Sequence, residues 1–457
     1  MAKGNTQSLA YRLYPLNWFR LGLIDKYTLH YFSLGSILGG LSGGLWAISA
    51  IVLKKTLEGN NFEVTIFSMI GPVTALLAIF AAEWMRGRDK RKFILWSGLL
   101  GRLPMLAMFF ISSSGIFIFL AFLSTICGSV LTPATNSLLQ TNLTRNTLGK
   151  MYGWLTVLST ATLMISTVAS GYIMNAYPDS YHWLFVASAL LGIASSSVTA
   201  KIRPRTTSYQ GERTLHARHI PLLKVLRTSF LVPLRSNAEI MVRNRGFALF
   251  ERNFFLYGMA FMVLLPIVPI FLVERLNISY DEAGMALGLF SEIGLLIMTP
   301  IFAVIYDRLH PVSFSRWIFL LLGFYPLTLL ASGYLSRATN TPPIYWAYIA
   351  YLIFGFGMAG LSLVWMLGSI HFAGSDDATP YSGIHMALVG LRGMIGPMIG
   401  YLIYSYLGPR YGAEAVFILG AALFWLASFL MWKLYRDIRS SKIPDPSFRV
   451  ATPAPPA

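Results

Sequence analysis

The chain has 457 residues, of which 55% are hydrophobic and 12% are charged, and its formal net charge is +17. Soluble domains carry about twice that share of charged residues, so the composition predicts a membrane protein. The positive charge does not indicate nucleic-acid binding, because the Lys and Arg residues are scattered between apolar runs and in the two tails. A single cysteine, Cys127, excludes a disulfide within the chain and a cysteine-based metal site.

The first 30 residues are expected to remain outside the bilayer core. Apolar residues alternate there with Arg12, Arg20 and Lys26, a mixture typical of an amphipathic helix on the membrane surface. Asp25 and Lys26 interrupt the apolar stretch and no small-residue cleavage pattern follows, so we do not expect a cleavable signal peptide.

Twelve apolar runs follow, each long enough to cross a bilayer as a helix. A hydrocarbon core of about 30 Å needs about 20 helical residues, and backbone groups in lipid must be hydrogen-bonded within their own segment. The predicted spans are residues 31–53, 64–84, 93–113, 115–138, 151–175, 182–200, 253–273, 283–306, 316–335, 343–370, 383–407 and 413–434. The predicted fold class is an all-α polytopic membrane protein with twelve transmembrane helices.

The middle segment, residues 201–252, divides the spans into two sets of six. This predicts one bundle over residues 31–200 and a second over residues 253–434. The middle segment is basic and mixes apolar residues with Lys and Arg, which predicts an interfacial helix on anionic lipid, with a regulatory docking site as the alternative. Residues 435–457 are rich in Pro, Ser and Ala, and we expect a disordered cytoplasmic tail.

The two sets of spans resemble each other in sequence. Residues 171–177, Gly-Tyr-Ile-Met-Asn-Ala-Tyr, match residues 400–406, Gly-Tyr-Leu-Ile-Tyr-Ser-Tyr, at the ends of spans five and eleven. Internal repeats of this kind are typical of transporters, because two related halves can move about a central site.

The distribution of basic residues predicts the orientation. An even number of spans puts both ends on one side, and the linkers of that side carry most of the Lys and Arg, in residues 86–92, 145–150, 201–252 and 308–316. The positive-inside rule therefore puts both termini in the cytoplasm, in a plasma membrane or a bacterial inner membrane. The linker 371–382 is acidic, but acidic residues contribute little to this rule.

Two linkers on the terminal side carry related charged turns. The linker after span eight reads Ala303-Val-Ile-Tyr-Asp307-Arg308, and the linker after span two reads Glu83-Trp-Met-Arg-Gly87-Arg88. With twelve spans and a long basic middle segment, these turns make residues 30–435 resemble the major facilitator superfamily. The resemblance implies two pseudo-symmetric six-helix bundles around a central cavity.

The resemblance also implies gating residues. In that family, the acidic residue of the turn locks the cytoplasmic gate in the outward-facing state by meeting a basic residue and a helix N-terminus. This role carries over to Asp307, Arg308 and Arg88, and with a shift of one residue to Glu83, because Trp84 takes the acidic position. The alternative is that both segments are only charged turns that end a span.

Small residues recur at helical spacing in spans one and eleven. Span eleven resembles a glycine- and proline-containing stretch that proton-coupled antiporters of the family carry in span five. Because small residues let helix backbones approach closely, close packing is the expected role of both sets. The glycines are Gly35, Gly39, Gly40, Gly43 and Gly44 in span one and Gly390, Gly393, Gly396 and Gly400 in span eleven.

Three ionisable residues lie near the middle of predicted spans: Arg102, Glu292 and Arg392. A charge in the centre of a span costs at least about 2.5 kcal/mol, so each is a functional candidate. The family arrangement puts spans eight and eleven beside the central cavity, which favours Glu292 and Arg392, with a structural ion pair between them as the alternative. Arg102, beside Pro104, is also a candidate, with hydrogen bonding at a kink as its alternative.

The chemistry of these side chains suggests roles in binding. Arg392 can hold an anionic group with its planar fork of donors, and Glu292 can bind and release a proton. Trp46 in span one can stack on a ligand, with packing as the alternative. His371 and His385 are expected at the membrane interface.

Together these features predict a secondary transporter that moves a small organic anion by alternating access, coupled to protons. The alternatives are proton-coupled efflux of lipophilic or cationic compounds, with Glu292 as their partner, and a non-transporting receptor or scaffold. We do not expect an enzyme, a metal site or a cofactor, because the sequence has no nucleotide-binding loop and no cluster of nucleophiles or metal ligands. The expected partners are a small-molecule substrate, a coupling proton and membrane lipids, including anionic lipids of the inner leaflet.

Overall fold

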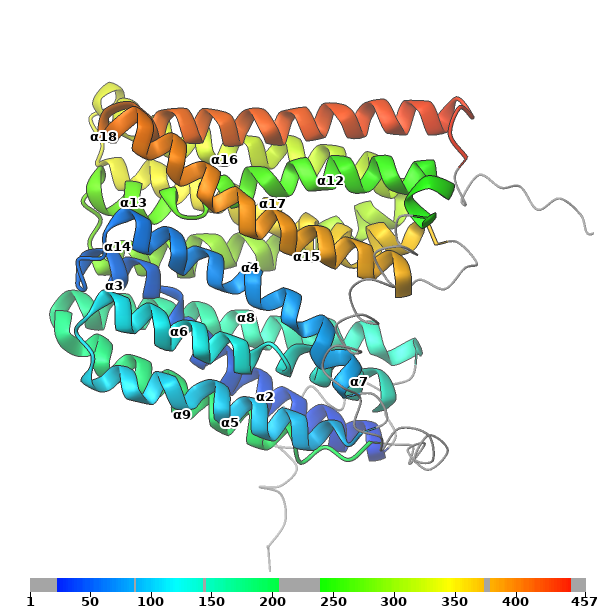
Figure 1. Cartoon of the computed structure of the whole chain (residues 1–457), viewed down its shortest axis with the longest axis horizontal. Helices are drawn as coiled ribbons and strands as arrows, with labels where there is room; N and C mark the ends of the chain where they lie inside the picture. The colour runs from blue at the N-terminus through cyan, green and yellow to red at the C-terminus, as the bar shows by residue number, and fades with distance from the viewer. Residues whose placement is uncertain (1–22, 86–87, 143–144, 205–238, 374–378, 445–457) are drawn as a thin grey trace, which may run out of the picture.

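The structure is a computed structural model that describes residues 23–85, 88–142, 145–204, 239–373 and 379–444 (Figure 1). Within these ranges the chain is almost entirely helical. The surface helix expected before residue 23, the interfacial helix expected in the middle segment and the tail after residue 444 lie outside the described residues.

The N-terminal half contains six spans, four of which are divided into two helical pieces. Its elements are α2 (Leu23–Ala47), α3 (Ser49–Lys55), α4 (Asn61–Trp84), α5 (Lys90–Ala107), η2 (Met108–Phe110), α6 (Ser114–Gly128), α7 (Leu131–Asn142), α8 (Arg145–Ala176), η3 (Pro178–Ser180) and α9 (Tyr181–Thr199).

The C-terminal half repeats this plan with longer helices. Its elements are α12 (Arg245–Leu264), α13 (Ile267–Glu274), α14 (Tyr280–Gly284), the π-helix η5 (Met285–Phe290), α15 (Ser291–Arg308), α16 (Pro311–Thr339), α17 (Pro343–His371) and α18 (Thr379–Arg439). The last of these is two spans joined at Gly408, whose φ of 73° lies outside the helical region.

The helices confirm the predicted fold class. In the described residues, eleven helical units are long and apolar enough to cross a membrane. The helix α4, with 24 residues, would extend over about 36 Å and is long enough to be the twelfth span. One boundary differs from the sequence prediction: α12 begins at Arg245 rather than at residue 253, so the first span of the second half is longer.

Glycines bring the helices of each half close together. A Cβ atom at Gly40 of α2 would lie 2.3 Å from the carbonyl oxygen of Ser159 in α8. A Cβ atom at Gly400 of α18 would lie 2.1 Å from the carbonyl oxygen of Val263 in α12. The close packing predicted for the glycines of spans one and eleven is therefore confirmed at these positions.

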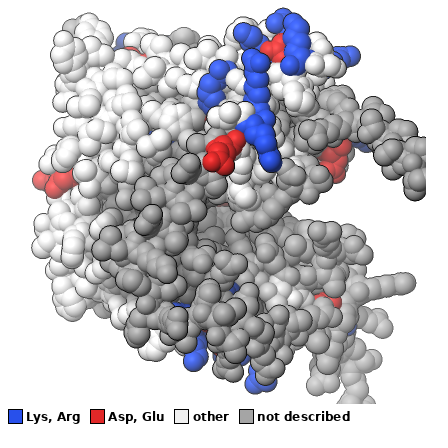
Figure 2. Space-filling view, turned by 45° about the vertical axis from the view of Figure 1, so that its right-hand side comes forward, with Lys and Arg blue, Asp and Glu red and all other residues white. Residues whose placement is uncertain are grey.

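The ends of the helices define two faces of the molecule. The terminal face carries Leu23, Thr199, Arg245 and Arg439, where the two halves begin and end, and the far face carries the turns after α3 and α13. The two halves lie one above the other in Figure 1, with α3, α13 and α14 close together at the far face. Figure 2 shows a hollow between the halves from the side of the terminal face.

Candidate functional site

Polar side chains join the two halves at the far face. The Lys54 ammonium forms an ion pair of 2.7 Å with Glu274, and Lys55 Nζ donates to the carbonyl oxygen of Ile278 at 2.5 Å. The hydroxyl groups of Thr56 and Tyr280 are also hydrogen-bonded to each other. Since the lysines and Thr56 belong to the N-terminal half and their partners to the C-terminal half, these contacts close the far face.

Glycines allow the halves to touch below this closed face. A Cβ atom at Gly171 of α8 would lie 2.5 Å from the carbonyl oxygen of Tyr280 and 2.9 Å from the Cα of Gly284. Nearer the middle of the spans, a Cβ atom at Gly393 of α18 would lie 2.1 Å from the Cβ of Pro72 in α4. The contact between the halves is therefore backbone to backbone or backbone to ring, with no room for larger side chains.

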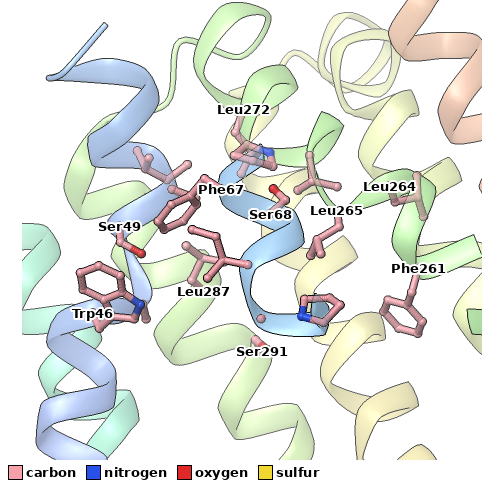
Figure 3. A pocket seen from close by; sticks show the side chains of 18 of the residues that line it. Trp46, Ser49, Phe67, Ser68, Phe261, Leu264, Leu265, Leu272, Leu287 and Ser291 are labelled. Carbon is pink, nitrogen blue, oxygen red and sulfur yellow. The ribbon is translucent and has the colours of Figure 1, made fainter. Parts of the chain in front are cut away.

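A cavity of about 550 Å³ lies between the two halves, in the region between the closed far face and the level of Pro72. Its volume is within the usual range for a pocket that binds a small organic molecule. Figure 3 shows Trp46 and Ser49 from the first span, Phe67 and Ser68 from α4, and Leu287 and Ser291 from the π-helix and α15. Leu265 and Phe261 of the seventh span complete the opposite wall. Both halves thus contribute to one chamber.

The lining of this first cavity is apolar and aromatic. Trp46 packs against Phe67, Phe117 and Phe185, with ring centroids 5.0 to 6.2 Å apart, so its indole is held by its neighbours. The polar side-chain groups of the lining are hydroxyl groups and the indole N–H of Trp46, and none of the described lining residues is charged. Such a chamber favours an apolar or aromatic body with few polar groups.

A second cavity of about 710 Å³ adjoins the first, because Trp46, Gly71 and Thr125 line both. It lies mainly within the N-terminal half and is more polar. Its described lining has one charged residue, Arg102, together with hydroxyl groups and Asn136. The guanidinium of Arg102 passes close to Gly192 of α9 and donates from Nη1 to the sulfur of Met105 at 3.2 Å.

A sequence comparison identifies the family. The sequence model of the Major Facilitator Superfamily matches residues 31–376 and residues 253–456. The chain belongs to the major facilitator superfamily. As a member of this superfamily it is a multi-pass membrane transporter of a small solute and not an enzyme. No curated protein sequence matches it significantly.

Solved structures of superfamily transporters share this fold. A mutant of the nucleoside transporter NupG has a TM-score of 0.68 at 12% identity and covers 89% of this chain and 100% of its own. A peptide transporter of the POT type, solved with sulfate, has a TM-score of 0.66 at 15% identity and covers 90% and 94%. An inward-facing bacterial homologue of the human lysosomal transporter Spinster has a TM-score of 0.62 at 14% identity and covers 91% and 99%. At these identities the likeness concerns the fold alone.

The structure of this superfamily member does not bring Glu292 and Arg392 together in a shared cavity. Arg392 is only 1% exposed and lies inside the C-terminal half, where its Nη1 donates to the carbonyl oxygen of Phe254 at 2.9 Å. Its guanidinium lies 5.3 to 5.5 Å from the ring centroids of Phe254, Tyr257 and Trp365. Glu292 is half-buried beside Ser291, and neither residue is among those that line the two cavities.

The predicted gating residues lie apart from the cavities. Asp307 and Arg308 are exposed at the terminal end of α15, and Arg88 is exposed beyond the terminal end of α4. Within the described residues, Asp307 and Arg308 form no hydrogen bond or ion pair with the other half. The side chain of Glu83 lies outside the described residues, although its backbone belongs to α4.

Two buried residues were missed or misplaced by the sequence analysis. His385, expected at the membrane interface, is 3% exposed, and its Nδ1 lies 3.1 Å from both carboxyl oxygens of Glu251. Glu251, 1% exposed, was assigned to the middle segment because the apolar run was drawn from residue 253. The sequence signal that could have identified this site is the acidic residue Glu251 itself, which directly precedes the predicted span.

Proposed function

We propose that the protein is a secondary transporter of a small amphipathic organic anion, that it works by alternating access, and that a proton gradient drives it. The substrate would bind across the two adjoining cavities, with a different part of the molecule in each. The first cavity, lined by Trp46 and Phe67, suits the apolar body, and the second cavity, with Arg102, suits the anionic group.

The observation that carries the anion proposal is that the guanidinium of Arg102 lines a cavity without a paired carboxylate among the described residues. Its guanidinium lines the second cavity and has the sulfur of Met105 as its hydrogen-bond partner, with no carboxylate paired to it among the described residues. A guanidinium stays charged inside a membrane protein and presents five donors in a planar fork. An anionic group of a substrate would satisfy these donors while Trp46 contacts the rest of the molecule. Arg392 is a poorer candidate because its environment is closed.

The direction of opening follows from charge. The halves touch at the far face and the hollow opens toward the terminal face, which carries Arg243, Arg308, Arg316, Arg436 and Arg439 in the described residues. The positive-inside rule supports a cytoplasmic terminal face. On that assignment, the structure corresponds to an inward-open state of the transport cycle, with Asp307 and Arg308 released from the gate.

A second candidate function is efflux of lipophilic or cationic compounds. The uncharged aromatic lining of the first cavity favours it, and Glu292, next to the lining residue Ser291, is the carboxylate that would attract a cation. Within the described residues Glu292 has no hydrogen-bond or ion-pair partner that would neutralise it. A receptor or scaffold is disfavoured, because a cavity shared by both halves has no evident role in a protein that does not transport.

The first experiment is an uptake and efflux screen of metabolites in cells that overexpress the protein. Solutes that pass the screen are then measured in proteoliposomes with and without an imposed pH gradient. We expect anions with an apolar body to accumulate, and we expect Arg102→Gln to lower their flux by at least about tenfold. Arg102→Lys is the matched control, because it keeps the charge and loses the planar fork, so its flux should be intermediate.

Two results would contradict this proposal. Unchanged anion flux in Arg102→Gln would remove Arg102 from the substrate site. Flux limited to cations, with loss in Glu292→Gln, would favour the efflux function. If no tested solute is transported and both variants behave like the wild type, the result favours the alternative of a receptor or scaffold.

A further inference from the structure

A cluster of charged side chains is buried inside the C-terminal half, and none of its members lines either cavity. Glu251, His385 and Arg392 are 1%, 3% and 1% exposed, the first on α12 and the other two on α18. Glu251 and His385 each lie six residues from the start of their helix at the terminal face, or about 9 Å along the helix axis. Buried charges are costly unless they are compensated, so a cluster of three needs an explanation.

The hydrogen bonds of His385 leave one nitrogen open. Its Nδ1 lies 3.1 Å from both carboxyl oxygens of Glu251. Opposite an ionised carboxylate, which only accepts hydrogen bonds, Nδ1 is the donor of this contact. The other ring nitrogen, Nε2, is buried and has no hydrogen-bond partner in the described part of the chain. In the neutral ring this nitrogen is a vacant acceptor, which can take up one proton and form an imidazolium paired with Glu251.

Two charged groups of opposite sign lie near His385, the carboxylate of Glu251 and the guanidinium of Arg392. The carboxylate of Glu251 stabilises an imidazolium, and the guanidinium of Arg392, which interacts electrostatically with Glu251, competes for the same carboxylate. The phenol of Tyr257 is a further titratable group beside Arg392 in the described part of the chain. The ring of Trp365 on α17 packs edge-on against His385 at 5.1 Å and brings no charge.

The cluster lies next to a contact between the two halves. Arg392 is adjacent in sequence to Gly393, the residue of α18 that meets Pro72 of α4. The helix α18 is also held to α12 by the hydrogen bond from Arg392 to the carbonyl oxygen of Phe254. His385 and Arg392 both attach α18 to α12, through Glu251 and Phe254, so a change of charge at His385 acts on the same pair of helices that positions Gly393 against the other half.

We propose that His385, paired with Glu251 and opposed by Arg392, is the proton-binding site that biases the exchange between the two access states. This rests on the proposed proton coupling and names the residues that carry it. A proton from the terminal face binds at Nε2 of His385 without any bond breaking in the protein, and its release returns the neutral ring. The half-buried Glu292 is then not the coupling residue.

The test measures conformation against pH without any substrate. Spin labels are attached at Ser113→Cys and Arg337→Cys, which are exposed at the far face of the two halves, in a Cys127→Ser background. The distance distribution between the labels is recorded by pulsed electron paramagnetic resonance in lipid nanodiscs between about pH 5 and about pH 8. We expect the populations of the conformations with a closed and with an open far face to change with pH.

The decisive variant is His385→Asn. The amide nitrogen of asparagine can replace Nδ1 as the donor to Glu251, while the titratable Nε2 is removed, so the packing is largely kept. We expect loss of the pH-dependent change in His385→Asn and in Glu251→Gln, and its retention in the matched control Glu239→Gln, which removes an exposed carboxylate. Glu292→Gln tests the rival carboxylate. Thermal unfolding of the same samples shows which variants are folded, and His385→Asn decides the matter if Glu251→Gln is not.

The outcomes separate this inference from the proposed function. If the wild type responds to pH and His385→Asn responds equally, the proton site lies elsewhere while proton coupling stands. If the response disappears in Glu292→Gln instead, Glu292 is the coupling residue. If the wild type shows no response to pH at all, both the site and the proton coupling of the proposed function are wrong.

Discussion

The ion pair between Lys54 and Glu274, 2.7 Å in length, joins the two halves of the transporter at the far face. Lys54 also donates to the side chain of Asn61 at 2.6 Å, and Glu274 accepts from the hydroxyl of Tyr404 at 2.8 Å. Because each charge is also held by its own half, the pair is preorganised on both sides. The far face cannot open while this pair is intact.

The first prediction is that Glu274→Gln shifts the protein toward states with an open far face. Loss of a partly buried ion pair is expected to change the balance by about 1–2 kcal/mol, or roughly five- to thirtyfold in the ratio of states. The distance between labels at Ser113 and Arg337 would report this shift. The double variant Lys54→Glu with Glu274→Lys exchanges the two charges and should restore part of the closed population. If the closed population is no larger in this double variant than in Glu274→Gln, the ion pair does not hold the far face closed.

The second prediction concerns the glycine contact below this ion pair. A side chain at Gly171 would collide with the carbonyl oxygen of Tyr280 in the other half, so Gly171→Val should prevent closure of the far face and abolish transport. Gly153→Val on the same helix is the matched control, because nothing lies within 4 Å of a Cβ atom there. Both variants carry the same change in helix propensity, so equal transport in the two would contradict a steric role for Gly171.

The spans and the fold could be predicted from sequence because a run of apolar residues is a local property. Contacts between helices are not local. Arg392 was correctly placed inside a span, but its depth does not reveal which neighbour it meets. The carbonyl oxygen of Phe254 and the ring of Trp365 reach it from two other helices. A central charge could therefore be identified as unusual without showing whether it faces a cavity.

Glu251 shows a second limit of sequence reasoning. Charged residues near the end of a span lower the local hydropathy, so the predicted run began at residue 253 and left Glu251 in the middle segment. The helix begins at Arg245, which turns Glu251 into a buried residue that faces His385. Similarly, Lys54 and Glu274 follow apolar runs as ordinary flanking charges, and only the packing of the two halves pairs them.

The third prediction tests the first cavity as the substrate chamber. Leu265 lines this cavity and is 40% exposed, so Leu265→Trp should fill the chamber while leaving the packed interior intact. We expect flux of any transported solute to fall at least about tenfold, with little change in thermal stability. Leu367→Trp is the matched control, because Leu367 is 43% exposed and does not line either cavity. Equal flux in the two variants would place the substrate elsewhere.

The fourth prediction concerns the gate at the terminal face. Asp307 and Arg308 are exposed and, within the described residues, form no hydrogen bond or ion pair with the other half, as expected if they act only when this face is closed. Asp307→Asn should therefore leave the present state unchanged and destabilise the opposite one, so that labels at the far face remain at their closed distance and turnover falls. Glu239→Gln, which removes an exposed carboxylate from the same face, is the control for the change in net charge.

Combination with the far-face variant makes this prediction sharper. Asp307→Asn favours an open terminal face and Glu274→Gln favours an open far face, so their effects on the populations should oppose each other. The double variant should therefore show a larger closed population than Glu274→Gln alone, because Asp307→Asn raises the free energy of the state with an open far face, and for two sites that share no contact the free-energy changes should add. A double variant that behaves like Glu274→Gln alone would mean that Asp307 belongs to a charged turn and takes no part in gating.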